Sequence, residues 1–274
     1  MSELWSRLGF LAIALVVYRI GTHIPIPGIN PEQVAALFQQ SQGTILQYFN
    51  LFSGGALERM SIFALSVVPY ISSAIVMQLF SNSVPYLQEL KKDGQAGRNK
   101  ITQYTRYGTV IFALIQSSAL TVTLQTAGLI DAGSIFSAFV AVISIVTGTM
   151  FLMWLGEQIS ERGIGNGISI IIATSIITGV PRAFGQALEQ TQQGDLNYLL
   201  LIVLAVLTLL VVAFVVFVEN AQRKITVNYA QRNQVRGMIQ APSSFLPLKL
   251  NMSGVIPAIF EITFLLFPDS LSSW

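Results

Sequence analysis

Residues 196–218 read LNYLLLIVLAVLTLLVVAFVVFV, a run that contains no Asp, Glu, Lys or Arg. A helix of about 20 apolar residues crosses the roughly 30 Å hydrocarbon core of a membrane, so this run predicts a transmembrane helix. Further charge-free runs that are long enough cover residues 60–88, 107–130, 132–156 and 163–181. Residues 4–24 and 251–270 are weaker candidates, and with them the sequence predicts seven spans.

The composition of the whole chain points the same way. Of its 274 residues 53% are hydrophobic and 10% are charged, whereas soluble domains carry roughly 25% charged residues. The net charge of +2 is too small for a nucleic-acid surface, and the high hydrophobicity excludes intrinsic disorder. The absence of Cys and the single His exclude disulfides, thiol chemistry and most zinc sites. We therefore predict an all-α, polytopic bundle of transmembrane helices.

The distribution of Lys and Arg predicts the orientation, because basic residues accumulate in cytoplasmic loops. With the N-terminus in the cytoplasm, 12 basic residues fall in inside segments and 3 in outside segments. Two inside loops, residues 85–106 and 220–250, are both long and basic. Such loops either set topology alone or dock a cytosolic partner, and the length of 220–250 favours docking.

Residues 33–57 carry no charge, but they contain five Gln and one Asn and are too polar to span the membrane. Residues 45–60 are short and semi-polar and lead directly into the next predicted span. This pattern predicts a half-length segment that is buried in protein or lines water. Gly54 and Gly55 would permit a sharp turn within it, although a simple turn between two helices is the alternative.

Two predicted spans share a short pattern. Residues 66–71 read SVVPYI and residues 254–259 read GVIPAI, so both contain V-x-P-x-I. The loop assignment places the two copies in opposite directions across the membrane, as in inverted repeats that surround a central pathway. The repeat would be five helices long and its second copy incomplete, so we expect this chain to be a fragment or a truncated form of a ten-helix protein.

Several motifs occur in order along nearly the whole chain. They are RIG at 19–21, IPIPG at 24–28, FSGGA at 52–56, QYTRYG at 103–108, MWLGEQISERGIGNGIS at 153–169, VNYA at 227–230 and LPLKLNM at 246–252. Together they resemble the SecY family, the central subunits of the bacterial protein-conducting channel. The resemblance implies a clamshell of two inverted five-helix halves. Residues 1–181 would form the N-terminal half, and residues 196–274, with the cytoplasmic loop 220–250, would form part of the C-terminal half.

The resemblance also implies the functional residues. A pore ring of aliphatic side chains falls on Val67, Ile71, Ile172 and Ile259, which sequence alone would assign to an ordinary core. The plug falls on Phe52, Ser53, Gly54, Gly55, Ala56, Leu57, Glu58, Arg59 and Met60. A lateral gate that opens to lipid falls on Ser72, Gln78, Gln116, Asn251 and Phe267. The polar gate residues could instead make independent hydrogen bonds between helices.

By the same resemblance, Lys224, Arg232 and Arg236 in the basic loop would dock the ribosome or the SecA motor ATPase. Further implied partners are the SecE and SecG subunits, signal peptides, nascent polypeptides and membrane lipid, and the location is the bacterial cytoplasmic membrane. The sequence indicates no enzyme, cofactor or metal site. A passive protein-conducting channel is thus the leading hypothesis. A secondary transporter of a small solute is the alternative, and an intramembrane hydrolase lacks a paired nucleophile and base.

Overall fold

A computed structural model of the chain describes residues 2–29, 34, 50, 53–130, 135–192, 197–227 and 244–249. The described elements fall into two compact units, one with residues up to Phe184 and one that begins at Gly185. The division into inverted halves stays a prediction, because compactness does not test the repeat symmetry. Membrane helices dominate both units.

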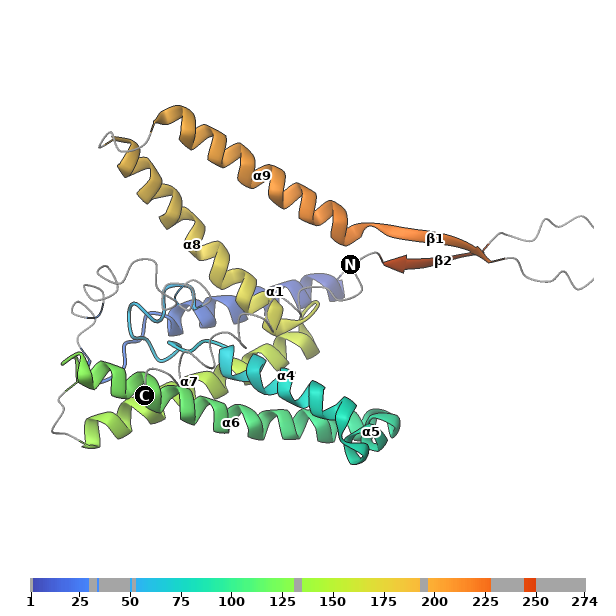
Figure 1. The fold of residues 1–274 in the computed structure, drawn as a ribbon, viewed down its shortest axis with the longest axis horizontal. Coiled ribbons are helices and arrows are strands. Elements are labelled where there is room, and N and C mark those ends of the chain that lie inside the picture. The colour runs from blue at the N-terminus through green and yellow to red at the C-terminus, as the bar shows by residue number, and fades with distance from the viewer. Residues whose placement is uncertain are drawn as a thin grey trace, which may run out of the picture. The chain divides into compact units, whose positions relative to one another are not determined.

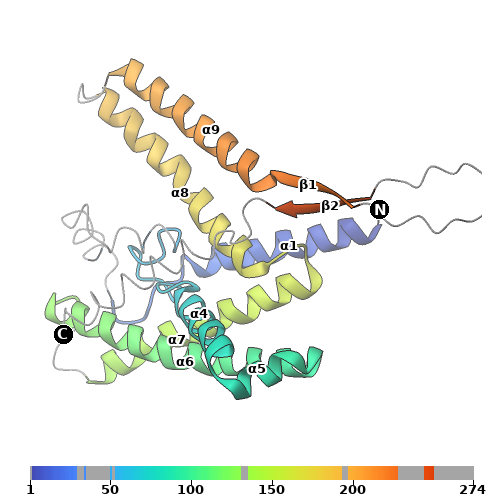
Figure 2. The ribbon, with the colours of Figure 1, turned by 45° about the vertical axis from the view of Figure 1, so that its right-hand side comes forward.

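In the first unit, two long helices lie side by side and run in opposite directions (Figure 1). These are α6 (Gly94–Thr126) and α7 (Ile135–Arg162). The short helices α4 (Val68–Ser83) and α5 (Pro85–Lys92) pack on α6, and α1 (Ser2–Gly21) packs on α7 (Figure 2). Where α4 meets α6, Gly108 leaves room for Ser73, whose hydroxyl donates to the carbonyl oxygen of Thr105 at 2.7 Å. This close approach attaches α4 firmly to the long helices.

The predicted span 60–88 is not one helix. Residues 61–67 are not helical, and α4 begins at Val68 and has 16 residues. Ser66 has a φ of 51°, which an α-helix does not accept, and Pro69 follows in the first turn of α4, where a missing N–H costs no hydrogen bond. Helix α4 is therefore about 24 Å long, shorter than the hydrocarbon core of a bilayer.

Three helices extend beyond their predicted spans. Helix α6 begins at Gly94, inside the predicted loop 85–106, and α7 continues past 156 to Arg162. Helix α8 (Gly167–Gln192) likewise ends well after residue 181. Charged side chains are costly in hydrocarbon but acceptable in a helix in water, so the charge-free runs marked the membrane crossing rather than the ends of the helices.

Five described helices are long and apolar enough to cross a membrane, namely α1, α6, α7, α8 and α9 (Tyr198–Asn220). The predicted spans at 4–24, 107–130, 132–156, 163–181 and 196–218 each correspond to one of them. Of the two other predicted spans, 60–88 contains no helix longer than the short α4, and 251–270 lies outside the described residues.

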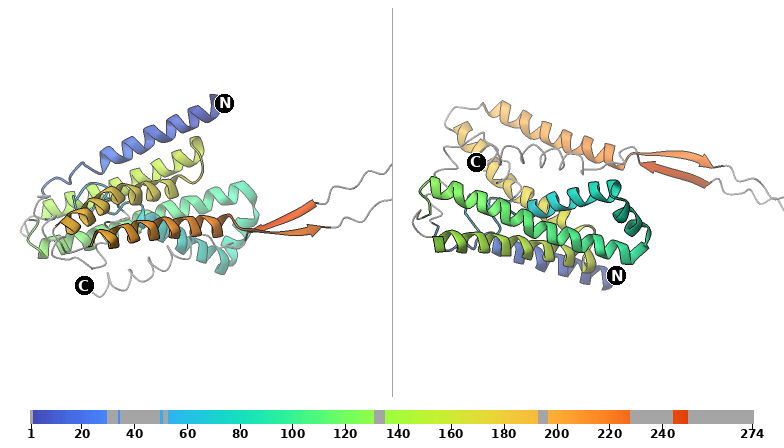
Figure 3. Two further views of the ribbon diagram at one scale, coloured as in Figure 1. Left: turned by 90° about the horizontal axis from the view of Figure 1, so that it is seen from above. Right: turned by 60° about the horizontal axis from the view of Figure 1, so that its bottom comes forward.

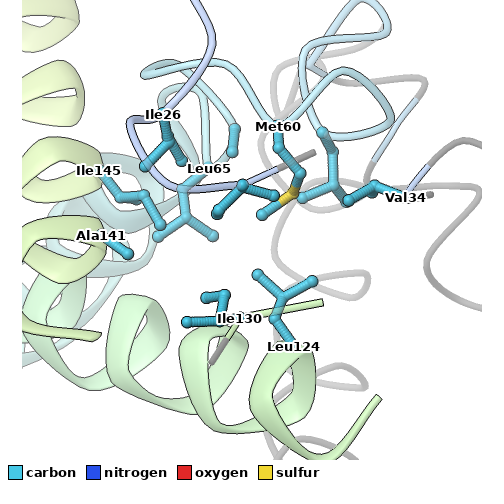
Figure 4. Packing of buried hydrophobic residues seen from close by; sticks show 11 residues of the cluster. Ile26, Val34, Met60, Leu65, Leu124, Ile130, Ala141 and Ile145 are labelled. Atoms are coloured by element: carbon cyan, nitrogen blue, oxygen red, sulfur yellow. The ribbon is translucent and has the colours of Figure 1, made fainter. Parts of the chain in front are cut away.

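A first apolar cluster packs the connecting segments of this unit against α6 and α7. It joins Leu124 of α6 and Ile145 of α7 to Ile26, Met60 and Leu65 from the connecting segments, and Figure 4 shows these side chains pointing toward one another. The cluster therefore fixes the segment after α1 and the C-terminal end of the predicted plug on the two long helices.

In the second unit, α9 is followed directly by β1 (Gln222–Val227), which pairs antiparallel with β2 (Ser244–Lys249) (Figure 3). The register places Arg223 opposite Leu248 and Lys224 opposite Pro247. The predicted loop 220–250 thus begins and ends in paired strands. We did not predict them, because two short strands of mixed composition with a Pro in one of them give little periodic signal.

Candidate functional site

A second apolar cluster brings five segments of the first unit together. Buried members are Tyr18 of α1, Ala56 of the predicted plug, Val67 before α4, Leu152 of α7 and Ile171 of α8. These residues are at most 2% exposed. The cluster is a dry contact region where α1, α7 and α8 meet the chain that connects α1 to α4. We call it the seal cluster.

Three predicted pore-ring residues belong to the seal cluster. Val67 is a buried member, and Ile71 and Ile172 are half-buried and pack against it. Ile259, the fourth, lies outside the described residues. The cluster therefore brings together Val67, the residue before α4, Ile71 of α4 and Ile172 of α8. In the sequence, Ile172 lies about 100 positions after the other two.

The predicted plug is described from Ser53 to Met60 and is a compact turn; Phe52 lies outside the described residues. Gly54 and Gly55 have φ values of 66° and 82°, which favour glycine over other residues, so the predicted sharp turn is confirmed. Asn50 closes the turn: its side-chain amide donates to Glu58 Oε2 at 3.2 Å, and its Oδ1 accepts from the Glu58 N–H at 3.1 Å.

The C-terminal end of the plug is attached to the segment that follows α1. The N–H of Ile26 donates to the Met60 carbonyl at 2.8 Å, and the N–H of Ile62 donates to the Ile24 carbonyl at 3.0 Å. Nearby, Arg59 Nη1 lies 3.1 Å from His23 Nε2. The plug thus leaves the seal cluster through a short antiparallel pairing.

The N-terminal end of the plug rests on α1 and α8, through residues that the sequence analysis missed. The Tyr18 hydroxyl lies 2.5 Å from Ser175 Oγ of α8 and 3.4 Å from the carbonyl oxygen of Ser53. The Tyr18 ring stacks on Phe63, with centroids 6.1 Å apart and 5° between the planes. The signal in the sequence was a Tyr and a Ser inside two apolar spans, where a polar group needs a partner.

Of the predicted lateral-gate residues, the structure describes three. Ser72 is 5% exposed, and its hydroxyl donates to the Val68 carbonyl of its own helix at 3.2 Å. Gln78 is exposed, and Gln116 Oε1 is buried without a hydrogen-bond partner in the described part of the chain. Asn251 and Phe267 lie outside the described residues, so the predicted polar cluster stays a prediction.

Lys224, from the predicted docking loop, lies exposed on β1 with Arg223. Arg232 and Arg236 lie outside the described residues. Among the described residues, no group of three or more His, Cys, Asp or Glu side chains is placed to hold a metal ion.

Curated relatives cover the whole chain. It is 57% identical over 274 residues to a protein translocase subunit SecY of Pseudomonas aeruginosa. It is 54% identical over 278 residues to the protein of the same name from Escherichia coli K12. The chain spans 62% and 63% of the length of these two relatives, respectively. These relatives do not support the secondary-transporter alternative.

Solved structures share the fold at low sequence identity. A protein-conducting channel matches with a TM-score of 0.65 and 19% identity, over 95% of this chain and 56% of that one. A SecY channel studied for its plug domain matches with a TM-score of 0.70 and 19% identity, over 98% of this chain and 57% of that one. The predicted SecY-like helical fold is therefore confirmed.

The family model SecY matches residues 61–274. This region includes α4 to α9, the hairpin and all three described ring residues, Val67, Ile71 and Ile172. Because the matched region is well over half of the sequence, the chain belongs to the SecY family.

Proposed function

We propose that the chain forms the seal and part of the pore of a passive protein-conducting channel in the bacterial cytoplasmic membrane. The seal cluster carries this proposal, since it unites Val67, Ile71 and Ile172 with Ala56 of the plug. Secretory proteins would cross the membrane at this place, and membrane proteins would leave sideways between α4 and helices of the other half.

An apolar constriction has the physical properties that such a channel needs. A narrow ring of branched aliphatic side chains sheds water and blocks ions. It offers no hydrogen bonds or charges that would hold a polypeptide as it passes. The plug adds a second barrier, since its Ala56 is a member of the cluster and is fully buried.

A passive channel needs a partner that supplies energy. We propose that the ribosome or the SecA motor ATPase docks on loop 220–250, and that SecE and SecG complete the channel. In support of a ribosome partner, a solved neighbour with a TM-score of 0.64 is canine Sec61 in a ribosome-channel complex. The basic residues Arg223, Lys224 and Lys249 on the hairpin suit RNA phosphates. A cytosolic partner can reach loop 220–250 only if this loop is cytoplasmic. In the proposed topology the N-terminus is then cytoplasmic too.

Cysteine crosslinking tests the pore, because the chain has no native Cys. A secretory chain with one Cys is stalled during transport, and its disulfide to Ile71→Cys is measured. Ile143→Cys is the matched control, since Ile143 is 45% exposed on α7 and lies outside the seal cluster. We expect a crosslink at position 71 and none at position 143. A stalled chain that fails to crosslink at position 71 contradicts the channel proposal.

A further inference from the structure

The first turn of the plug lies directly against the backbone of α8. A β-carbon added to Gly54 would lie 3.2 Å from Ser175 Cα and 3.2 Å from Thr178 Oγ1. The turn that begins the plug therefore touches the backbone of α8 directly. Ser175, at the centre of this contact, is fully buried.

One hydroxyl group connects this contact to α1. Tyr18 is 1% exposed, and its Oη lies between Ser175 Oγ at 2.5 Å and the Ser53 carbonyl oxygen at 3.4 Å. Both neighbours belong to elements that the seal cluster brings together. The stacking of the ring on Phe63 holds the hydroxyl at this position.

The hydrogen bonds of the three groups can be satisfied in two ways. A Tyr hydroxyl has one proton to donate and can also accept. When Ser175 donates to the Ile171 carbonyl at 2.9 Å, Tyr18 donates to Ser175. When Ser175 instead donates to Tyr18, the Tyr18 proton is free for the Ser53 carbonyl. In both arrangements Tyr18 is the group that ties α1 to α8 beside the plug.

We propose that Tyr18 is the positioning residue of the closed plug, and that its hydroxyl acts as a latch together with Ser175. This inference rests on the proposed function, because it assigns a role within the seal. When the plug leaves, Ser53 departs and the Gly54 contact with α8 opens. The Tyr18 hydroxyl then loses the Ser53 carbonyl as an acceptor. A variant that lacks this hydroxyl has no such bond to lose, so its plug leaves more readily.

Single cysteines can measure this equilibrium without any transport of a substrate. Ala56→Cys is buried in the seated plug, since Ala56 is 0% exposed, and a membrane-impermeant maleimide added from outside reacts with it when the plug leaves. The labelling rate then follows the fraction of open molecules. Ala113→Cys on α6, also 0% exposed in the native chain, reports general loosening of the bundle.

We expect Tyr18→Phe to increase labelling of Ala56→Cys about fivefold, the effect of one lost hydrogen bond. Ser175→Ala should produce a smaller increase, because Tyr18 can still donate to the Ser53 carbonyl. The double variant should label no faster than Tyr18→Phe alone. Labelling of Ala113→Cys should not change. The control variants are Tyr107→Phe, at a site 67% exposed, and Ser144→Ala, whose hydroxyl bonds to Val140 of its own helix.

The latch is contradicted if Tyr18→Phe leaves Ala56→Cys labelling unchanged, or increases it together with that of Ala113→Cys. The latch is also contradicted if the increases in labelling caused by Tyr18→Phe and Ser175→Ala multiply in the double variant. The two residues share one hydrogen bond, which can be lost only once. These outcomes are independent of the crosslink at Ile71. Failure of the latch and failure of the channel proposal can therefore be told apart.

Discussion

The carbonyl oxygen of Ile62 lies directly over Gly148 of α7, where a β-carbon has no room. Gly148→Ala must therefore displace the segment that follows the plug or bend α7. We expect it to lower the free energy of unfolding by about 1–3 kcal/mol, as overpacking does. Gly9→Ala is the matched control, since an added β-carbon meets no described atom within 4 Å there, and should stabilise α1 by up to about 1 kcal/mol. Thermal unfolding in detergent measures both, and equal effects would contradict the close contact.

The sequence predicted the crossing helices but not the interruption after the plug. Charge-free runs locate hydrocarbon-compatible segments, and α6, α7, α8 and α9 contain such runs. Residues 61–67 are as apolar as the residues of a transmembrane helix, so their hydropathy does not distinguish them from α4. The local backbone conformation prevents a helix before Val68, because Ser66 has a φ of 51°. Pro69 was the one feature in the sequence that indicated this interruption.

The family resemblance singled out Val67, Ile71 and Ile172, which meet in the seal cluster, and their role as a pore ring stays a prediction. The contact of Tyr18 with Ser175 could not be predicted. Val67 and Ile71 stand beside a recognisable V-x-P-x-I pattern. Tyr18 and Ser175 are separated by 157 positions and carry no shared pattern. Their contact exists because α1 and α8 both pack around the seal cluster, which is a property of the tertiary fold.

Arg106 of α6 and Glu157 of α7 form a two-pronged ion pair, with both N–O distances at 2.9 Å. The pair is partly exposed, at 45% and 18% of the two side chains, so solvent weakens it. We expect Arg106→Lys, which cannot bond both oxygens, to reduce stability by about 1 kcal/mol or less. The reduction should shrink in high salt. Glu3→Gln, in an exposed pair with Arg7, is the control and should have no measurable effect.

The predicted lateral gate requires Gln116 and Asn251 to interact. Gln116 Oε1 is buried and lacks a partner among the described residues, and a buried unpaired amide costs about 1–3 kcal/mol. If Asn251 supplies the partner, Gln116→Leu and Asn251→Leu should be coupled by about 1 kcal/mol in a double-mutant cycle of unfolding. Gln103→Leu, at an exposed position of α6 outside the predicted gate, is the control for Gln116→Leu. Additive effects would favour independent hydrogen bonds between helices.

The basic loop gives a separate prediction about docking. Arg232→Glu with Arg236→Glu should weaken ribosome binding at least tenfold, because phosphate contacts depend strongly on charge. The slope of affinity against salt should also become shallower. Lys91→Glu with Lys92→Glu reverses the same number of charges at the end of α5 and is the control. Unchanged binding together with normal membrane insertion would mean that loop 220–250 sets topology alone.

The two glycines of the plug separate backbone strain from contact with α8. Both have positive φ, 66° at Gly54 and 82° at Gly55, so alanine costs about 1 kcal/mol at each position. The added β-carbon at Gly55 comes no closer than 3.8 Å to its neighbour, Arg59 Nη2, whereas at Gly54 it lies 3.2 Å from α8. Gly54→Ala should therefore unseat the plug several-fold more than Gly55→Ala, as measured by labelling of Ala56→Cys. Equal labelling in the two variants would show that the turn alone, and not its contact with α8, keeps the plug in place.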